Sequence, residues 1–117
     1  MTILSETSSY DTLLMTTRGG ALYTVRIPIA ATMRPVVTKV RTSTWQAFET
    51  LLTARCGQYG SLLVGIDKDT GNAYEYVVGH AAGTSTVIQS RYRVPWPFTD
   101  PIYFRSLNTD TRPLNGE

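Results

Sequence analysis

SLLVGIDKDTGNAYEYVV, residues 61–78, is the stretch that decides the fold class. Two runs rich in β-branched and aromatic residues, 61–66 and 73–78, flank the segment DKDTGN at 67–72. Asp, Gly and Asn favour tight chain reversals, because they form local side-chain hydrogen bonds or lack a Cβ. The stretch therefore predicts a β-hairpin.

Similar runs lie on both sides of this hairpin. Residues 10–17 and 21–29 flank Arg18-Gly19-Gly20, which predicts a second hairpin. Residues 36–42 and 85–94 also alternate in the period of two that is typical of strands, and 102–104 is a short apolar run that predicts a last strand. Threonine occurs 18 times, and together with Val, Ile and Tyr it favours strands throughout the chain.

The segment 43–57 carries a different signal. Ser43 and Gln46 fit a capping box, in which each side chain bonds a backbone amide of the other residue, and this predicts a helix over about 44–55. The apolar residues on one stripe of this helix are Trp45, Phe48, Leu51 and Leu52. The expected fold class is α+β, mainly β, with antiparallel sheet or sheets built from hairpins and one amphipathic helix packed on one face. A sandwich, a barrel and an open sheet all fit this pattern.

The 117 residues suit one domain. Both ends are polar and poor in aromatic residues, which is typical of extended arms. We expect an N-terminal arm at 1–9, a single β-rich domain at 10–105 and a C-terminal arm at 106–117.

Charge, cysteine content and hydropathy limit which partners and which cellular location we expect. A net charge of +2 disfavours nonspecific binding to nucleic acid, and nine Arg against two Lys indicate fixed bidentate contacts instead. Cys56 is the one cysteine, so no internal disulfide can form. There is no signal-peptide pattern and no apolar run of the roughly 20 residues that span a bilayer. We expect neither secretion by a signal peptide nor a membrane partner.

A calcium loop is the first candidate for chemistry, because Asp67 and Asp69 match the Asp-x-Asp opening of an EF-hand loop. The match fails further along, since Asn72 stands where the loop needs glycine and Val78 where it needs a bidentate Glu. The preferred interpretation is a solvated turn with no metal.

Two other pairs of residues could support catalysis. Cys56 and His80 are the only thiol and imidazole, and Glu49 and Glu75 could form a pair of carboxylates. No motif surrounds either pair. We predict no catalytic residue, no metal site and no cofactor, and therefore a protein that is not an enzyme.

Residues 91–98, RYRVPWPF, carry the functional prediction, because Arg and aromatic side chains dominate protein interfaces. The predicted partner-binding residues are Arg91, Arg93, Trp96, Phe98 and Tyr103. Two alternatives remain open. Trp96 and Phe98 could cap the core under a rigid loop, or the segment could bind single-stranded nucleic acid, which the low net charge disfavours.

The leading functional prediction is a structural or assembly protein that forms homo-oligomers or joins a larger assembly. A virion (phage) component is favoured, such as a capsid-decoration, connector or tail-associated subunit whose two arms hold its neighbours. It would be assembled in the host cytoplasm; a protein of another origin would be cytoplasmic. The alternative is a small binding or inhibitor module of the immunity or anti-defence type. An enzyme of unrecognised type would need Cys56 or His80 beside a carboxylate.

Overall fold

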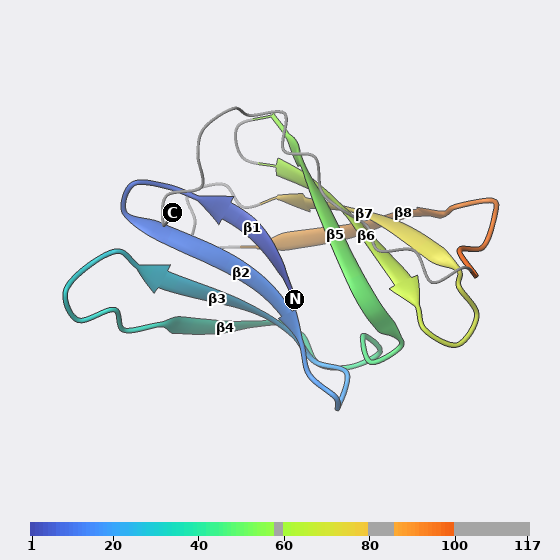
Figure 1. The fold of residues 1–117 in the computed structure, drawn as a ribbon, viewed down its shortest axis with the longest axis horizontal. Coiled ribbons are helices and arrows are strands. Elements are labelled where there is room, and N and C mark those ends of the chain that lie inside the picture. The colour runs from blue at the N-terminus through green and yellow to red at the C-terminus, as the bar shows by residue number, and fades with distance from the viewer. Residues whose placement is uncertain (58–59, 80–85, 100–117) are drawn as a thin grey trace.

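The computed structural model describes residues 1–57, 60–79 and 86–99. These residues form two antiparallel four-stranded sheets and no helix (Figure 1). Sheet A has the order β1 (Thr2–Glu6), β2 (Tyr10–Thr16), β3 (Leu22–Pro28) and β4 (Val36–Arg41). Sheet B has the order β5 (Phe48–Cys56), β6 (Gly60–Asp67), β7 (Ala73–Gly79) and β8 (Val87–Arg93). The described part of the chain is all-β, so the α+β expectation is wrong.

Each sheet is a meander in which strands that follow one another in sequence are hydrogen-bonded neighbours. Both predicted hairpins are confirmed, because β2 pairs with β3 and β6 pairs with β7, both antiparallel. The alternating runs 36–42 and 85–94 correspond to β4 and β8. The strand predicted at 102–104 and the arm predicted at 106–117 lie outside the described residues.

The helix predicted at 44–55 is replaced by a turn and by β5. Thr44 has a φ of 76°, which the first turn of a right-handed helix does not permit. The Trp45 amide donates to the carbonyl of Gly20 at 3.0 Å, so this turn is docked on the β2–β3 connection. From Phe48 onward the backbone pairs with β6. Partners distant in sequence thus override a local pattern that fits a helix, which is the usual limit of propensity arguments.

The N-terminal arm predicted at 1–9 is largely a strand. Residues Thr2–Glu6 form β1, which pairs antiparallel with β2. Leu4 is only 6% exposed and belongs to the buried core. The low aromatic content of this segment suggested a free arm, but one leucine on a paired strand is enough to bind it to the sheet.

The core lies between the two sheets and takes one buried side chain from every strand except β4, whose partly buried Val40 packs against it. Its buried members are Leu4, Leu14, Leu22, Trp45, Leu51, Leu63, Val78 and Ile88. Trp45 comes from the segment that links β4 to β5, and its ring centroid lies 5.2 Å from that of Phe48 and 4.9 Å from that of Tyr76. The Phe48 ring in turn lies over Gly65, where a Cβ would be 2.9 Å from the ring. Glycine is therefore required at 65 by close packing.

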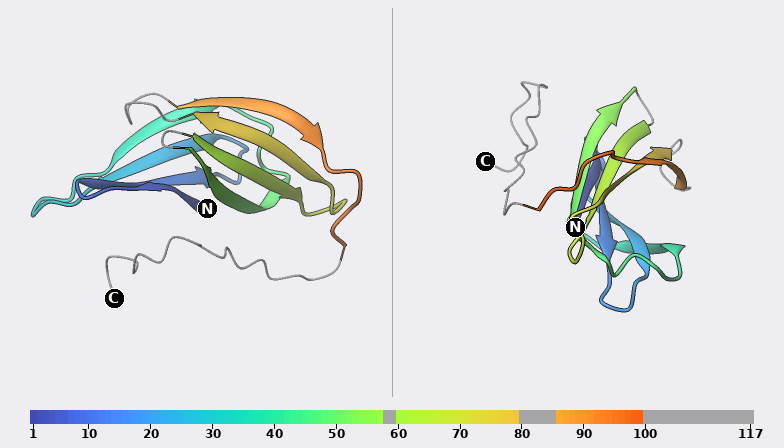
Figure 2. Two further views of the ribbon diagram at one scale, coloured as in Figure 1. Left: turned by 90° about the horizontal axis from the view of Figure 1, so that it is seen from above. Right: turned by 90° about the vertical axis from the view of Figure 1, so that its right-hand side faces the viewer.

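Side-chain hydrogen bonds join the two sheets at both sides. β1 lies beside β5 (Figures 1 and 2), and the Thr53 hydroxyl donates to the carbonyl of Ile3 at 2.7 Å. At the other side, Arg41 at the end of β4 donates from Nη2 to the carbonyl of Ile88 in β8 at 2.7 Å. Because these bonds use side chains, the two sheets stay separate backbone ladders around one core.

A pair of adjacent substitutions tests the assignment of β1. Leu4→Ala should lower the free energy of unfolding by about 2–5 kcal/mol, because it leaves a cavity in the core. Ile3→Ala should change it by less than about 0.5 kcal/mol, because Ile3 is 48% exposed. Urea unfolding followed by tryptophan fluorescence measures both values. Equal, negligible effects would show that residues 1–9 form a free arm after all.

Candidate functional site

The predicted partner-binding residues of β8 are exposed at the edge of sheet B. Arg91 and Arg93 are both exposed, and Tyr92 between them is 55% exposed. A bulge interrupts the β7–β8 pairing: Gln89 pairs with Val77 and Arg93 pairs with Tyr74, so β8 has one residue more than β7 between these two pairs. The two arginines therefore do not follow one unbroken alternation along the strand.

The Tyr92 side chain is tied to its neighbouring strand. It hydrogen-bonds the carboxylate of Glu75, and this bond, with the negative charge of Glu75, raises the pKa of the Tyr92 hydroxyl. Register agrees, since Tyr92 lies directly opposite Glu75. The pairing of β7 with β8 thus places the Glu75 carboxylate beside an exposed aromatic side chain.

Trp96 is held outward on a pinned segment. The Val94 amide donates to the carbonyl of Ala73 at 2.8 Å, and the Phe98 amide donates to the carbonyl of Gly71 at 2.7 Å. Between these two bonds, Pro95 and Pro97 restrict the backbone on both sides of Trp96, which is 61% exposed. The other predicted residues differ, because Phe98 is half-buried and Tyr103 lies outside the described residues. We call Arg91, Tyr92, Arg93 and Trp96 the β8 surface.

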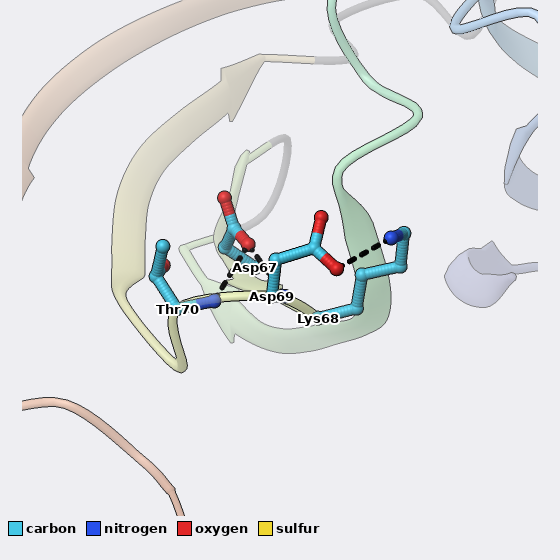
Figure 3. A network of polar contacts seen from close by, with 4 residues as sticks. All are labelled: Asp67, Lys68, Asp69 and Thr70. Carbon is cyan, nitrogen blue, oxygen red and sulfur yellow. Dashed lines mark hydrogen bonds and ion pairs between the residues drawn. The ribbon is translucent and has the colours of Figure 1, made fainter.

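The candidate calcium loop is a hydrogen-bonded turn (Figure 3). Asp67 Oδ1 accepts from the backbone amides of Asp69 at 2.8 Å and Thr70 at 3.1 Å. The Lys68 ammonium contacts Asp69 Oδ1 at 2.7 Å. The two amides lower the pKa of the Asp67 carboxyl below its usual 3.8. These contacts account for one oxygen of each aspartate and support the turn interpretation.

The remaining candidates for chemistry do not form a group in the described part of the chain. Cys56 is exposed at the end of β5, and His80 lies outside the described residues. Glu49 is exposed near the start of β5. Within residues 1–57, 60–79 and 86–99, no three His, Cys, Asp or Glu side chains come together as metal ligands. The same residues contain no helix that could cross a bilayer.

The structure shows an apolar surface that the sequence did not reveal. On the face of sheet A that points away from the core, register places four apolar residues in one row across all four strands: Ile3, Leu13, Val25 and Val37. Ile3 and Val37 at the ends are 48% and 58% exposed, and the two central residues are half-buried. Beside the row on the same face lie Met15, Tyr23 and Ile27. We call these seven residues the outer face; none of them belongs to the buried core.

The alternation in β3 explains why this face was missed. Tyr23, Val25 and Ile27 form the apolar side of the strand, and a period-2 pattern normally places that side inward. The buried side instead carries Leu22 and Thr24, which are 0% and 7% exposed. Sheet A is thus apolar on both faces near its centre. The usable signal was Leu13 and Leu14, adjacent apolar residues that must point to opposite faces of a strand.

Charge on this face of sheet A lies in the two rows that flank the apolar row. Glu6 and Asp11 lie opposite each other in one flanking row, where Asp11 also pairs with Ile27. Lys39 lies in the other flanking row, opposite Tyr23, with its ammonium 5.6 Å from the centroid of the Tyr23 ring. An apolar centre with a charged rim is the usual anatomy of a protein interface.

Comparison of the chain with protein-family models, with curated proteins and with solved structures gives no match.

The pKa of Asp67 gives a test of the turn. The depressed pKa means that the carboxylate stabilises the fold above the ordinary carboxyl range, and that this contribution is lost as the pH falls through the lowered value. Asp67→Asn should therefore reduce stability near neutral pH, with a difference from wild type that disappears in acid. Urea unfolding near neutral pH and in acid measures the difference in the free energy of unfolding. Asp69→Asn is the control, since the exposed ion pair of Asp69 contributes little to stability. A difference that persists in acid would contradict this account.

Proposed function

We propose that this chain is a non-enzymatic assembly protein that holds neighbouring protein subunits through the outer face of sheet A. The observation that carries the proposal is the row Ile3–Leu13–Val25–Val37, which crosses the whole sheet opposite the core. Contiguous apolar surface on a folded domain marks a site of interaction. The fold already buries the inner face, so these side chains do not serve the core.

The β8 surface supports the same function as a second contact. Trp96 is presented on a backbone that is hydrogen-bonded on both sides and restricted by two prolines. An anchor that is already ordered loses little conformational entropy when a partner covers it. Several shallow contacts of this kind are typical of subunits that hold position in an assembly, since such subunits need complementary surfaces and no pocket.

Among assembly proteins, a virion component remains the leading proposal, such as a capsid-decoration, connector or tail-associated subunit. It is supported by the small β-rich domain and by the two surfaces, and it no longer depends on an arm at 1–9. Instead of acting as a free arm, the N-terminal residues form β1, which places Ile3 on the outer face where it can contact a neighbouring subunit.

The outer face is tested by a lysine substitution at its edge. Ile3→Lys should weaken association at least about tenfold, because it would place a charge in a desolvated apolar contact. Val87→Lys is the matched control, since Val87 is 56% exposed on sheet B, away from the outer face. Sedimentation velocity over a concentration series measures association, and urea unfolding shows that each variant is folded. Identical association of wild type and Ile3→Lys would contradict the proposal.

A binding or inhibitor module is the second candidate, favoured by the single exposed tryptophan on a stiff segment. This class predicts a chain that stays monomeric and captures one partner through Trp96. Trp96→Ala should then abolish capture without changing the unfolding midpoint, while Met33→Ala, at another exposed apolar residue, should leave capture intact. Pull-down from an extract with both immobilised variants measures this. Equal capture by the two variants would remove this candidate.

A further inference from the structure

The four edges of the two sheets are not equally protected. β1 and β5 lie beside each other, and carbonyls of Ile3 and Leu4 accept hydrogen bonds from the hydroxyls of Thr53 and Ser61. The β8 edge receives Arg41 at the carbonyl of Ile88. β4 differs, because Figure 1 shows it at the margin of sheet A with no described strand along its free side.

β4 is also exposed on both of its faces. Val36 and Val37 point to opposite faces and are 57% and 58% exposed. Thr38 and Lys39 are exposed as well. An edge of this kind offers unpaired backbone amides and carbonyls between β-branched side chains, and it pairs readily with another strand. Three of the usual protections are present: Pro35 precedes the strand, Lys39 lies within it, and a bulge interrupts the pairing with β3 near its end. Arg41 also donates from Nη1 to the carbonyl of Val40 at 2.9 Å, so the most open part of the edge is 36–39.

We propose that β4 pairs antiparallel with β4 of a second copy of this chain, about a twofold axis that passes midway between the two copies of Thr38. This deepens the proposed assembly function, on which it rests, by naming one neighbour as a second copy. A twofold contact is self-complementary, so if one residue lies opposite another, the reverse pairing also holds. Two identical antiparallel strands that continue one sheet about such an axis must therefore be centred on a residue that lies opposite its own copy.

The charges of β4 select Thr38 as that residue. With Thr38 at the axis, Val36 lies opposite Val40 and Val37 lies opposite Lys39 of the second copy, so no two like charges meet. Centring on Lys39 would put two ammonium groups opposite each other, which is destabilising. Centring on Val37 would draw Pro35 into the ladder, where it has no amide to donate. The Thr38 register pairs residues 36–40 of the two copies, keeps the lysines apart and leaves Pro35 outside this span.

Pairing in this register extends the outer face. The two copies of sheet A become one continuous sheet, and all their outer faces point to the same side, because a twofold axis normal to a sheet keeps its faces. Val37 then packs against the aliphatic part of Lys39 of the second copy, whose ammonium already lies over its own Tyr23 ring. The dimer thus presents a wider apolar surface to further neighbours than one chain does.

Disulfide trapping tests the register. In a Cys56→Ser background, which removes the exposed native thiol, Thr38→Cys should cross-link two chains under mild oxidation. Residues directly opposite in an antiparallel pair have Cα atoms about 4.5–5.5 Å apart, within the range of a disulfide. Val36→Cys is the control on the same face, because in this register it is four residues out of step with its own copy, about 14 Å away. Non-reducing electrophoresis should show Thr38→Cys cross-linking at least about tenfold faster.

A second variant covers the case in which the cysteine disturbs the fold. Thr38→Lys, which brings two lysines together at the axis, should weaken association in sedimentation velocity at least about tenfold relative to wild type. Equal cross-linking of Thr38→Cys and Val36→Cys, or a wild-type chain that sediments as 13.0 kDa at every concentration, would overturn the β4 pairing.

The two proposals fail separately. If Thr38→Cys cross-links preferentially but Ile3→Lys has no effect on association, only the outer-face function is overturned. Association that depends on Ile3 without preferential cross-linking at Thr38 would overturn the β4 pairing alone.

Discussion

Burial of Trp45 between the two sheets is the interaction on which the rest of the structure depends. The residue lies where the chain passes from β4 to β5, and it is only 5% exposed. Its ring contacts Phe48 and Tyr76 of sheet B, while its amide bonds Gly20 of sheet A. A fully buried tryptophan contributes about 3–5 kcal/mol, a large part of the stability of a domain this size. One residue thus ties the connection to both sheets.

Gly20 shows how closely the turn that carries Trp45 packs on the β2–β3 connection. It has a φ of 90°, and a Cβ at this position would collide with the side chain of Gln46. The turn at 43–47 therefore rests directly on the β2–β3 connection, with no space between them. Because that contact fixes where β5 begins, it also fixes the position of sheet B relative to sheet A. The side-chain hydrogen bonds at Thr53 and Arg41 then join sheets that Trp45 has already brought together.

The way the core is built leaves particular surfaces uncovered. Two small sheets that share one core bury one face each, and the opposite face of sheet A keeps its own apolar row. β4 lies too far from the centre to bury more than Val40, which packs against the core. The exposed features therefore gather on the outer face, on β4 and on the β8 surface. These are the exposed features on which the proposed assembly function rests.

Local sequence alone determined the hairpins, the absence of an internal disulfide and the proline-flanked position of Trp96, whereas the exposure of Trp96 was left open. Each depends on neighbouring residues, such as the turn at 67–72 or the prolines at 95 and 97. Tertiary structure decided three other points: that 48–56 is a strand, that residues Thr2–Glu6 join sheet A, and that Val25 points away from the core. The apolar spacing at 45–52 fits a helix stripe as well as a turn followed by a strand. Only pairing with β6 and burial of Trp45 against a distant sheet distinguish the two, and neither can be read from adjacent residues.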